Sequence, residues 1–385
     1  MEAIRLKTEH LFTPIGIDIA EPQLFWNCEG GKRQSAYQIV ASDDAGNRLW
    51  DSGKVESALM RAKWGGAPVK PKTKVLWQVR LWDETDAVGS WEQSTFETGI
   101  DTGIDTGIDT GIDTGIDAWQ AKWITGNYKA NKKKRYPVDC FRKFFDASDV
   151  KKARLYITAC GLYEARLNGA RAGDFILAPG ITDYRRRVQY QAYDVTALLK
   201  SGRNTLTVWL ADGWYRGSCG AWGLKNQYGT EIRLLARLEI IHPDGRLDLI
   251  CTDETWDWSN DGPIRFADNK DGEIVDASKM PSYGRKAKAT AHPVIPTASN
   301  NVPVTEHEHL SAALIKTPSG RTVLDFGQNI AGYISFALKA KAGQTLKLRF
   351  GELLDENGEF TQKNIQCSNK RTTTPLQQVI YTCKE

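Results

Sequence analysis

A glycine-rich loop in the middle of the sequence gathers the side chains best suited to bind a sugar. It follows a strand-like run at 205–211, spans residues 212–229, and contains glycines that let the backbone approach a ligand closely. Aromatic rings offer flat faces to the C–H face of a pyranose, while charged and amide groups bond its hydroxyls. We therefore expect ligand binding by the loop residues Asp212, Trp214, Tyr215, Arg216, Trp222 and Asn226. In the alternative, the aromatic rings pack on their own domain or on a further domain and bind no sugar.

Carboxylates near this loop in the sequence raise the question of a calcium ion, which takes oxygen ligands that converge. The candidate metal ligands are Asp174 and Asp183, with Asp212 as a third. We expect no required cofactor and leave calcium open. The segment 268–273 has some likeness to a calcium loop, but Lys270 fills a ligand position, so a structural turn is predicted.

Composition excludes several classes of function. The net charge is only +4, and the basic run 132–135 lacks interleaved aromatic residues, so a solvated loop is expected and a nucleic-acid site is not. The sequence has no apolar run long enough for a membrane span and shows no secretory signal. Seven scattered cysteines without a C-x-x-C pair fit free thiols in a reducing compartment. A cytoplasmic location is expected.

Alternating apolar residues and frequent turn signals predict an all-β chain. The clearest strand-like runs are 37–42, 75–82, 153–159, 205–211 and 346–350. Only 195–200 resembles a helix, with Asp194 as its expected N-cap. All 13 tryptophans lie at or before Trp258, and each is either a core residue of a sandwich or a sugar-facing ring.

A Thr-Gly-Ile-Asp repeat, five units long at 98–117, stands apart from the rest of the chain. Its four-residue period matches neither a helix nor a strand, so we interpret it as an expanded linker; calcium binding by its aspartates is the alternative. A second boundary is expected at 285–303, where large apolar residues are scarce and three prolines occur. The predicted domains are therefore 1–97, 118–290 and 300–385, with 98–117 as the linker.

A series of motifs in order resembles the N-terminal β-domains of bacterial α-L-rhamnosidases of glycoside hydrolase family 78. The first domain, with Trp-Gln-Val-Arg-Leu-Trp-Asp at 77–83 and Phe-Glu-Thr-Gly at 96–99, is similar to the fibronectin-type-III-like module of these enzymes. The second, with Leu-Ala-Asp-Gly-Trp-Tyr-Arg-Gly at 210–217, resembles their jelly-roll carbohydrate-binding module. The third, with Leu-Asp-Phe-Gly-Gln-Asn at 324–329, resembles the β-sandwich that precedes the catalytic barrel. Tandem β-sandwiches are the fold that this resemblance implies.

The resemblance also implies what is missing. The family's catalytic domain is an α-helical barrel that follows the third β-domain, and no run of long amphipathic helices occurs here. Glu352 and Asp355 lie in a strand-to-turn segment and are expected to form a turn, not a catalytic pair. We expect a non-catalytic portion of an enzyme that removes terminal α-L-rhamnose from glycosides, inactive alone, whose partners are a rhamnose-containing glycoside and the missing barrel. The alternatives are a chain that hydrolyses rhamnosides itself and a purely structural scaffold that binds no sugar.

Overall fold

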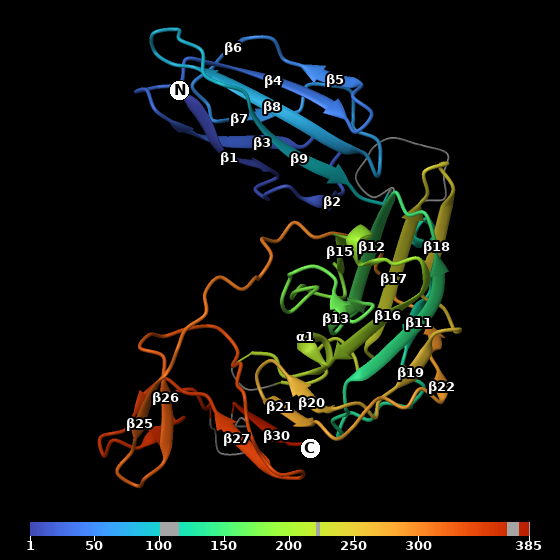
Figure 1. Cartoon of the computed structure of the whole chain (residues 1–385), viewed down its shortest axis with the longest axis vertical. Coiled ribbons are helices and arrows are strands. Elements are labelled where there is room, and N and C mark those ends of the chain that lie inside the picture. The colour runs from blue at the N-terminus through green and yellow to red at the C-terminus, as the bar shows by residue number, and fades with distance from the viewer. Residues whose placement is uncertain (101–114, 221–223, 368–376, 385) are drawn as a thin grey trace.

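Strands make up almost all of the regular structure (Figure 1). The computed structural model describes residues 1–100, 115–220, 224–367 and 377–384. The strand-like runs found in the sequence lie within strands, apart from Phe350 at the end of the last run, so the all-β prediction is confirmed. None of the helices in these described ranges has the length and hydrophobicity that a membrane span requires.

The first domain is a sandwich of two sheets. Its smaller sheet has the order β1 (Glu2–Thr8), β3 (Gln23–Glu29), β7 (Arg61–Lys63). The larger has the order β2 (Ile15–Ile17), β9 (Glu92–Thr98), β8 (Lys74–Trp82), β4 (Ala36–Asp43), β5 (Arg48–Asp51), with β6 (Val55–Glu56) also paired to β4. On β8 the side chains of Trp77, Val79 and Leu81 are fully buried while their neighbours face outward, as the alternation predicts.

The second domain is a larger sandwich. One sheet, here called the inner sheet, has the order β23 (Lys288–Thr290), β10 (Trp123–Thr125), β17 (Arg233–Ile241), β12 (Lys152–Cys160), β15 (Gln189–Asp194), β24 (Thr297–Ala298), with β18 (Leu247–Cys251) also on β17. The other, the outer sheet, has the order β14 (Ala170–Arg171), β13 (Leu162–Leu167), β16 (Gly202–Ala211), β11 (Asp139–Ala147), β19 (Asp257–Ser259), β22 (Arg285–Lys286). The core lies between them and includes Phe141, Leu155 and Val208.

The third region has smaller sheets and shares one of them with the second. The hairpin of β20 (Ile264–Asp268) and β21 (Gly272–Asp276) continues through β30 (Gln378–Thr382) to β27 (Thr345–Arg349). Two further hairpins are β25 (Ala313–Lys316) with β26 (Thr322–Asp325), and β28 (Leu353–Leu354) with β29 (Phe360–Thr361). Because β21 pairs in parallel with β30, the sequence segment 264–276 ties the two regions together.

The regions expected to be connectors are partly built into the sheets. Thr98 ends β9, Ile100 is buried, and η1 (Gly115–Trp119) begins the second domain, whereas most of the predicted linker, at 101–114, lies outside the described residues. The predicted boundary at 285–303 contains β22, β23 and β24. The sheets of the second domain therefore extend to Ala298.

Helices are short. The expected helix at 195–200 is a 3-10 turn, η2 (Thr196–Leu198), and its N-cap is Val195, so the expectation that Asp194 is the N-cap is wrong by one residue. Asp194 still accepts the Thr196 N–H at 3.0 Å, which satisfies one free donor of this turn. One α-helical turn, α1 (Gly213–Arg216), was not predicted as a helix; it lies within the candidate loop.

Candidate functional site

The candidate loop begins where β16 ends, and its first glycine is required by both conformation and space. Gly213 has φ +52°, a region that favours glycine, and a Cβ there would lie 2.6 Å from Cγ of Leu162. The chain can therefore turn sharply from β16 into α1 against the start of β13. This turn places Asp212 and Arg216 on one side of α1, four residues apart.

Asp212 and Arg216 form a buried ion pair. Nε of Arg216 donates to Oδ1 of Asp212 at 2.7 Å, and Nη1 donates to the hydroxyl of Tyr128 at 2.7 Å. Asp212 and Arg216 are 3% and 4% exposed. Burial without a partner would be costly for either charge, so the pair stabilises the loop against the domain. The sequence predicted sugar contacts for both residues, and the structure shows contacts within the domain.

The other predicted ligand residues are divided between core and surface. Tyr215 is buried, its ring lies 5.3 Å from that of Tyr184, and its hydroxyl accepts from Nη1 of Arg233 at 2.8 Å. Trp214 is half-buried and packs against the edge of the core. Asn226 donates its backbone N–H to Arg216 O at 3.0 Å, and Trp222 lies outside the described residues. Among the described aromatic residues of the loop, Trp214 and Tyr228 are half-buried and Tyr215 is buried.

Arg135 fastens this loop to the β20–β21 hairpin. Its guanidinium pairs with Asp268 and lies 3.3 Å from Oδ2 of Asp271. Ser218, just after α1, donates its N–H to Asp268 at 2.8 Å and its hydroxyl to Asp271 at 2.6 Å. We call this set, Arg135, Ser218, Asp268 and Asp271, the latch. It connects the loop to a hairpin that continues into the third region.

The latch corrects one expectation and supports another. Lys132, Lys133 and Lys134 are exposed, as a solvated loop requires, but Arg135 is largely buried between carboxylates, so the expectation is wrong for Arg135. The segment 268–273 forms the predicted turn, because Asp268 pairs with Gly272 across the hairpin. Asp268 and Asp271 lie more than 130 residues from Arg135 in the chain, so no local pattern could have indicated these two partners.

Asp139 is a buried carboxylate beside this site. It accepts from Nε1 of Trp258 at 3.1 Å and from the hydroxyl of Tyr128 at 3.2 Å. Burial raises the pKa of Asp139 to about 7, although the nearby Arg216 guanidinium favours its ionised form. Sequence reasoning missed this residue because a single Asp at the start of a strand carries no distinguishing signal.

The predicted metal ligands do not gather around one point. Asp174 is exposed, and Asp183 forms an exposed pair with Arg185, with Nε–Oδ1 and Nη2–Oδ2 distances of 2.8 and 3.0 Å. Within the described ranges no three His, Cys, Asp or Glu side chains are arranged to hold a metal ion. Calcium binding therefore stays a prediction. Cys28, Cys140, Cys160, Cys219, Cys251 and Cys383 are free thiols.

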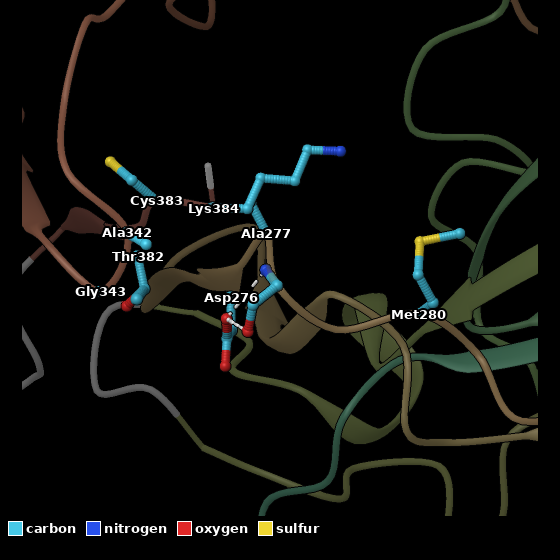
Figure 2. A pocket seen from close by; sticks show the side chains of 9 residues that line it. Asp276, Ala277, Met280, Ala342, Gly343, Thr382, Cys383 and Lys384 are labelled. Carbon is cyan, nitrogen blue, oxygen red and sulfur yellow. Dashed lines mark hydrogen bonds between the residues drawn. The ribbon is translucent and has the colours of Figure 1, made fainter.

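Neither the turn at Asp355 nor the pocket at Asp276, both in the described part of the chain, presents a pair of catalytic carboxylates. Asp355 accepts the backbone N–H groups of Asn357 and Glu359 at 3.0 and 2.9 Å, which confirms its role in a turn. A pocket of about 500 Å³ lies where β21 meets β30, with Met280 and Cys383 on opposite sides of Asp276 (Figure 2). Asp276 is the one acid among the described lining residues, and it accepts from the Ser278 hydroxyl at 2.6 Å. A glycosidase needs two carboxyl groups facing its substrate, which this pocket does not supply.

Comparison with known families explains this architecture. The family described as "Alpha-L-rhamnosidase N-terminal domain" matches residues 148–317, "Rha78A-like, N-terminal immunoglobulin domain" matches 3–102, and "Bacterial alpha-L-rhamnosidase concanavalin-like domain" matches 315–384. The chain belongs to the α-L-rhamnosidase family. It corresponds to the N-terminal portion of these enzymes.

Individual α-L-rhamnosidases are similar to this chain along nearly its whole length. An α-L-rhamnosidase of Formosa agariphila is 33% identical over 93% of this chain, and one of Alteromonas sp. (strain LOR) is 32% identical over 94%. The solved α-L-rhamnosidase of Aspergillus terreus superposes with a TM-score of 0.86 at 29% identity over the full chain, covering 44% of that protein. That of Streptomyces avermitilis, complexed with L-rhamnose, gives 0.80 at 25% identity, again over the full chain, covering 53% of that protein. The chain spans 40% and 41% of the length of the Formosa and Alteromonas enzymes.

Proposed function

We propose that this chain is the non-catalytic β-domain portion of an α-L-rhamnosidase, which supports the domain that hydrolyses terminal α-L-rhamnose and is inactive alone. The partner in this proposal is the α-helical barrel, and the substrate of the whole enzyme is a rhamnose-containing glycoside. The observation that carries the proposal is the apolar surface of the third region.

Large apolar side chains lie open on this region. Leu314, Val302 and Tyr333 are 75%, 72% and 63% exposed. Among the described residues from 301 onward, those that are buried are Thr317, Gln362 and Cys383, whereas both preceding domains have extensive apolar cores. A region with many exposed large apolar side chains and few buried residues favours a partner that covers it. We assign this interface to the barrel, since the relatives contain more than twice the length of this chain.

Substitution of an exposed leucine tests this assignment. Leu314→Ser is expected to change the free energy of unfolding by less than about 0.5 kcal/mol and to reduce binding of a hydrophobic dye. The matched control is Leu238→Ala, in the core at 1% exposed, which is expected to cost about 2–5 kcal/mol. A loss of 2 kcal/mol or more for Leu314→Ser would show that this leucine is already packed in a complete domain.

Rhamnose binding by the loop at 212–229 is a second proposed function, and the half-buried Trp214 favours it. One sugar offers few contacts against the freedom lost on association, so a dissociation constant on the order of 0.1–1 mM is expected. Trp214→Ala is expected to weaken L-rhamnose binding by about 1–3 kcal/mol in isothermal titration.

Adding a chelator to the titration distinguishes rhamnose binding through calcium from direct rhamnose binding by the loop. If calcium bridges protein and sugar, chelator and Asp183→Ala both abolish binding. If the loop binds rhamnose directly, chelator has no effect. If the folded chain gives no heat change at tens of millimolar L-rhamnose, neither form of rhamnose binding holds. The purely structural scaffold is then the remaining function.

A further inference from the structure

The candidate loop at 212–229 touches the basic run that follows β10. Nδ2 of Asn226 donates to the backbone oxygen of Lys132 at 3.4 Å. Lys132, Lys133 and Lys134 are exposed, and no acidic side chain in the described part of the chain forms an ion pair with any of them. Their ammonium groups are therefore available to an anion in solution.

Two further basic segments contact the same loop. The Arg185 guanidinium lies 5.5 Å from the ring centroid of Tyr228. Arg186, beside it in the chain, is exposed and has no ion-pair partner among the described residues. On the β20–β21 hairpin, Nζ of Lys270 donates to the backbone oxygen of Gly220. Three separate parts of the sequence thus bring basic residues to one loop.

These segments concentrate the positive charge of the whole chain. The stretches 129–135, 183–187, 224–229 and 268–271 contain ten basic and three acidic residues, a net charge of +7, whereas the complete chain carries +4. The remainder of the chain is therefore net negative, at −3. Like charges gathered at one place repel one another and attract counter-ions, so an anion that bridges them is bound favourably.

The three acidic residues of these stretches do not neutralise the exposed cations. Asp268 and Asp271 are buried in the latch, and Asp183 forms its exposed pair with Arg185. Four exposed cations remain without a partner in the described chain. We call them the basic rim: Lys132, Lys133, Lys134 and Arg186.

We propose that the basic rim binds the acidic groups of a rhamnose-containing glycan. Carboxylate and sulfate oxygens accept charge-assisted hydrogen bonds from ammonium and guanidinium groups, and these are stronger than bonds between neutral groups. The rhamnose component rests on the proposed function, whereas the acidic class follows from the charge of the rim. A glycan is favoured over a nucleic acid because the basic run lacks the interleaved aromatic residues typical of nucleic-acid sites.

Titration with a matched pair of oligosaccharides tests the proposal. One alternates rhamnose with a uronic acid, and the other is the same oligosaccharide with its carboxylates reduced to neutral hydroxymethyl groups. At about 0.01 M salt the acidic form is expected to bind about tenfold more tightly than the neutral form. This preference should shrink at about 0.15 M salt, because the Debye length falls from about 30 to about 8 Å. A sulfated rhamno-oligosaccharide, run in parallel, shows whether sulfate or carboxylate is bound more tightly.

Substitution of the lysines locates the effect. The triple variant Lys132→Gln, Lys133→Gln, Lys134→Gln is expected to bind the acidic form about tenfold more weakly than wild type, since three exposed charge contacts are lost. The matched control removes the same charge from exposed positions of the third region and should keep the wild-type affinity: Lys339→Gln, Lys341→Gln, Lys347→Gln.

Four outcomes would overturn the proposal. They are equal affinity of wild type for the acidic and neutral forms, no binding of either the uronate or the sulfated form, an equal loss in both triple variants, and duplex DNA bound as tightly as the acidic glycan. Failure of rhamnose binding by the loop gives a different result, which is no binding of the neutral form while the lysine-dependent binding of the acidic form persists. The scaffold is tested separately through Leu314.

Discussion

Arg154 of the second domain and Glu97 of the first form a two-point ion pair, with Nε–Oε1 3.0 Å and Nη2–Oε2 2.8 Å. Their side chains are 6% and 3% exposed, and Lys152 adds a third contact to Glu97 at 3.1 Å. The two domains are therefore joined by direct contacts at the end of β9, independently of the repeat that connects them in sequence.

Arg154→Met should test how much this pair contributes. The substitution keeps the apolar stem but leaves Glu97 buried with Lys152 alone, so the free energy of unfolding should fall by about 3 kcal/mol in urea titration. Arg185→Met, which breaks the exposed pair with Asp183, is the control and should cost less than about 1 kcal/mol. Equal costs for the two variants would show that burial adds nothing to the Glu97 pair.

The latch predicts a coupled loosening of two distant segments. Arg135→Ala leaves Asp268 and Asp271 buried without their main cation, so stability should fall by about 3 kcal/mol. Amide exchange should then speed up together in α1 and in the β20–β21 hairpin. Lys134→Ala, at the exposed neighbouring position, should leave both unchanged. Faster exchange in one segment alone would mean that the latch does not join them.

Asp139 predicts a specific dependence on pH. Its pKa is raised to about 7 by burial, whereas in the unfolded chain the carboxyl ionises near its ordinary 3.8. Below pH 3.8 the carboxyl is protonated in both the folded and the unfolded chain, so the stability associated with the buried neutral carboxyl is fully present. Between about pH 4 and 7 only the folded state holds the proton, so the free energy of unfolding falls by about 1.4 kcal/mol per pH unit. Above about pH 7 this loss is complete.

Asp139→Asn removes this titration while keeping both an acceptor for Trp258 and a partner for Tyr128. The difference in stability between the variant and wild type should therefore shift in favour of the variant from pH 4 to 7 and stay constant above. Chemical denaturation at each pH measures it. If the stability difference between variant and wild type is constant from pH 4 to 7, the pKa of Asp139 in the folded protein is not raised, which would contradict the prediction.

The sequence predicted the strands well because their pattern is local. Alternation along 75–82 determines which side chains of β8 are buried, and an Asp-Gly pair marks the turn between β20 and β21. The parallel pairing of β21 with β30 was not predictable in this way, because it joins segments about 100 residues apart without a shared motif.

The candidate site was predicted less well, because its contacts also join segments that are distant in the sequence. Loop residues were recognised by type, but residue type does not reveal whether a polar group is already paired. Arg216 donates to Asp212 and to the hydroxyl of Tyr128, so both charged residues already have partners within the domain. Whether a side chain is available to a ligand is determined by its burial and its neighbours in the fold, not by residue type.

The central proposal is that these 385 residues, which belong to the α-L-rhamnosidase family, do not catalyse hydrolysis by themselves. Incubation of the purified chain with an aryl α-L-rhamnoside, followed by release of the aryl alcohol, tests this most directly. We predict release no faster than in a protein-free control, at any pH between 4 and 9. Release that rises in proportion to the concentration of the chain and elutes with it would contradict the account.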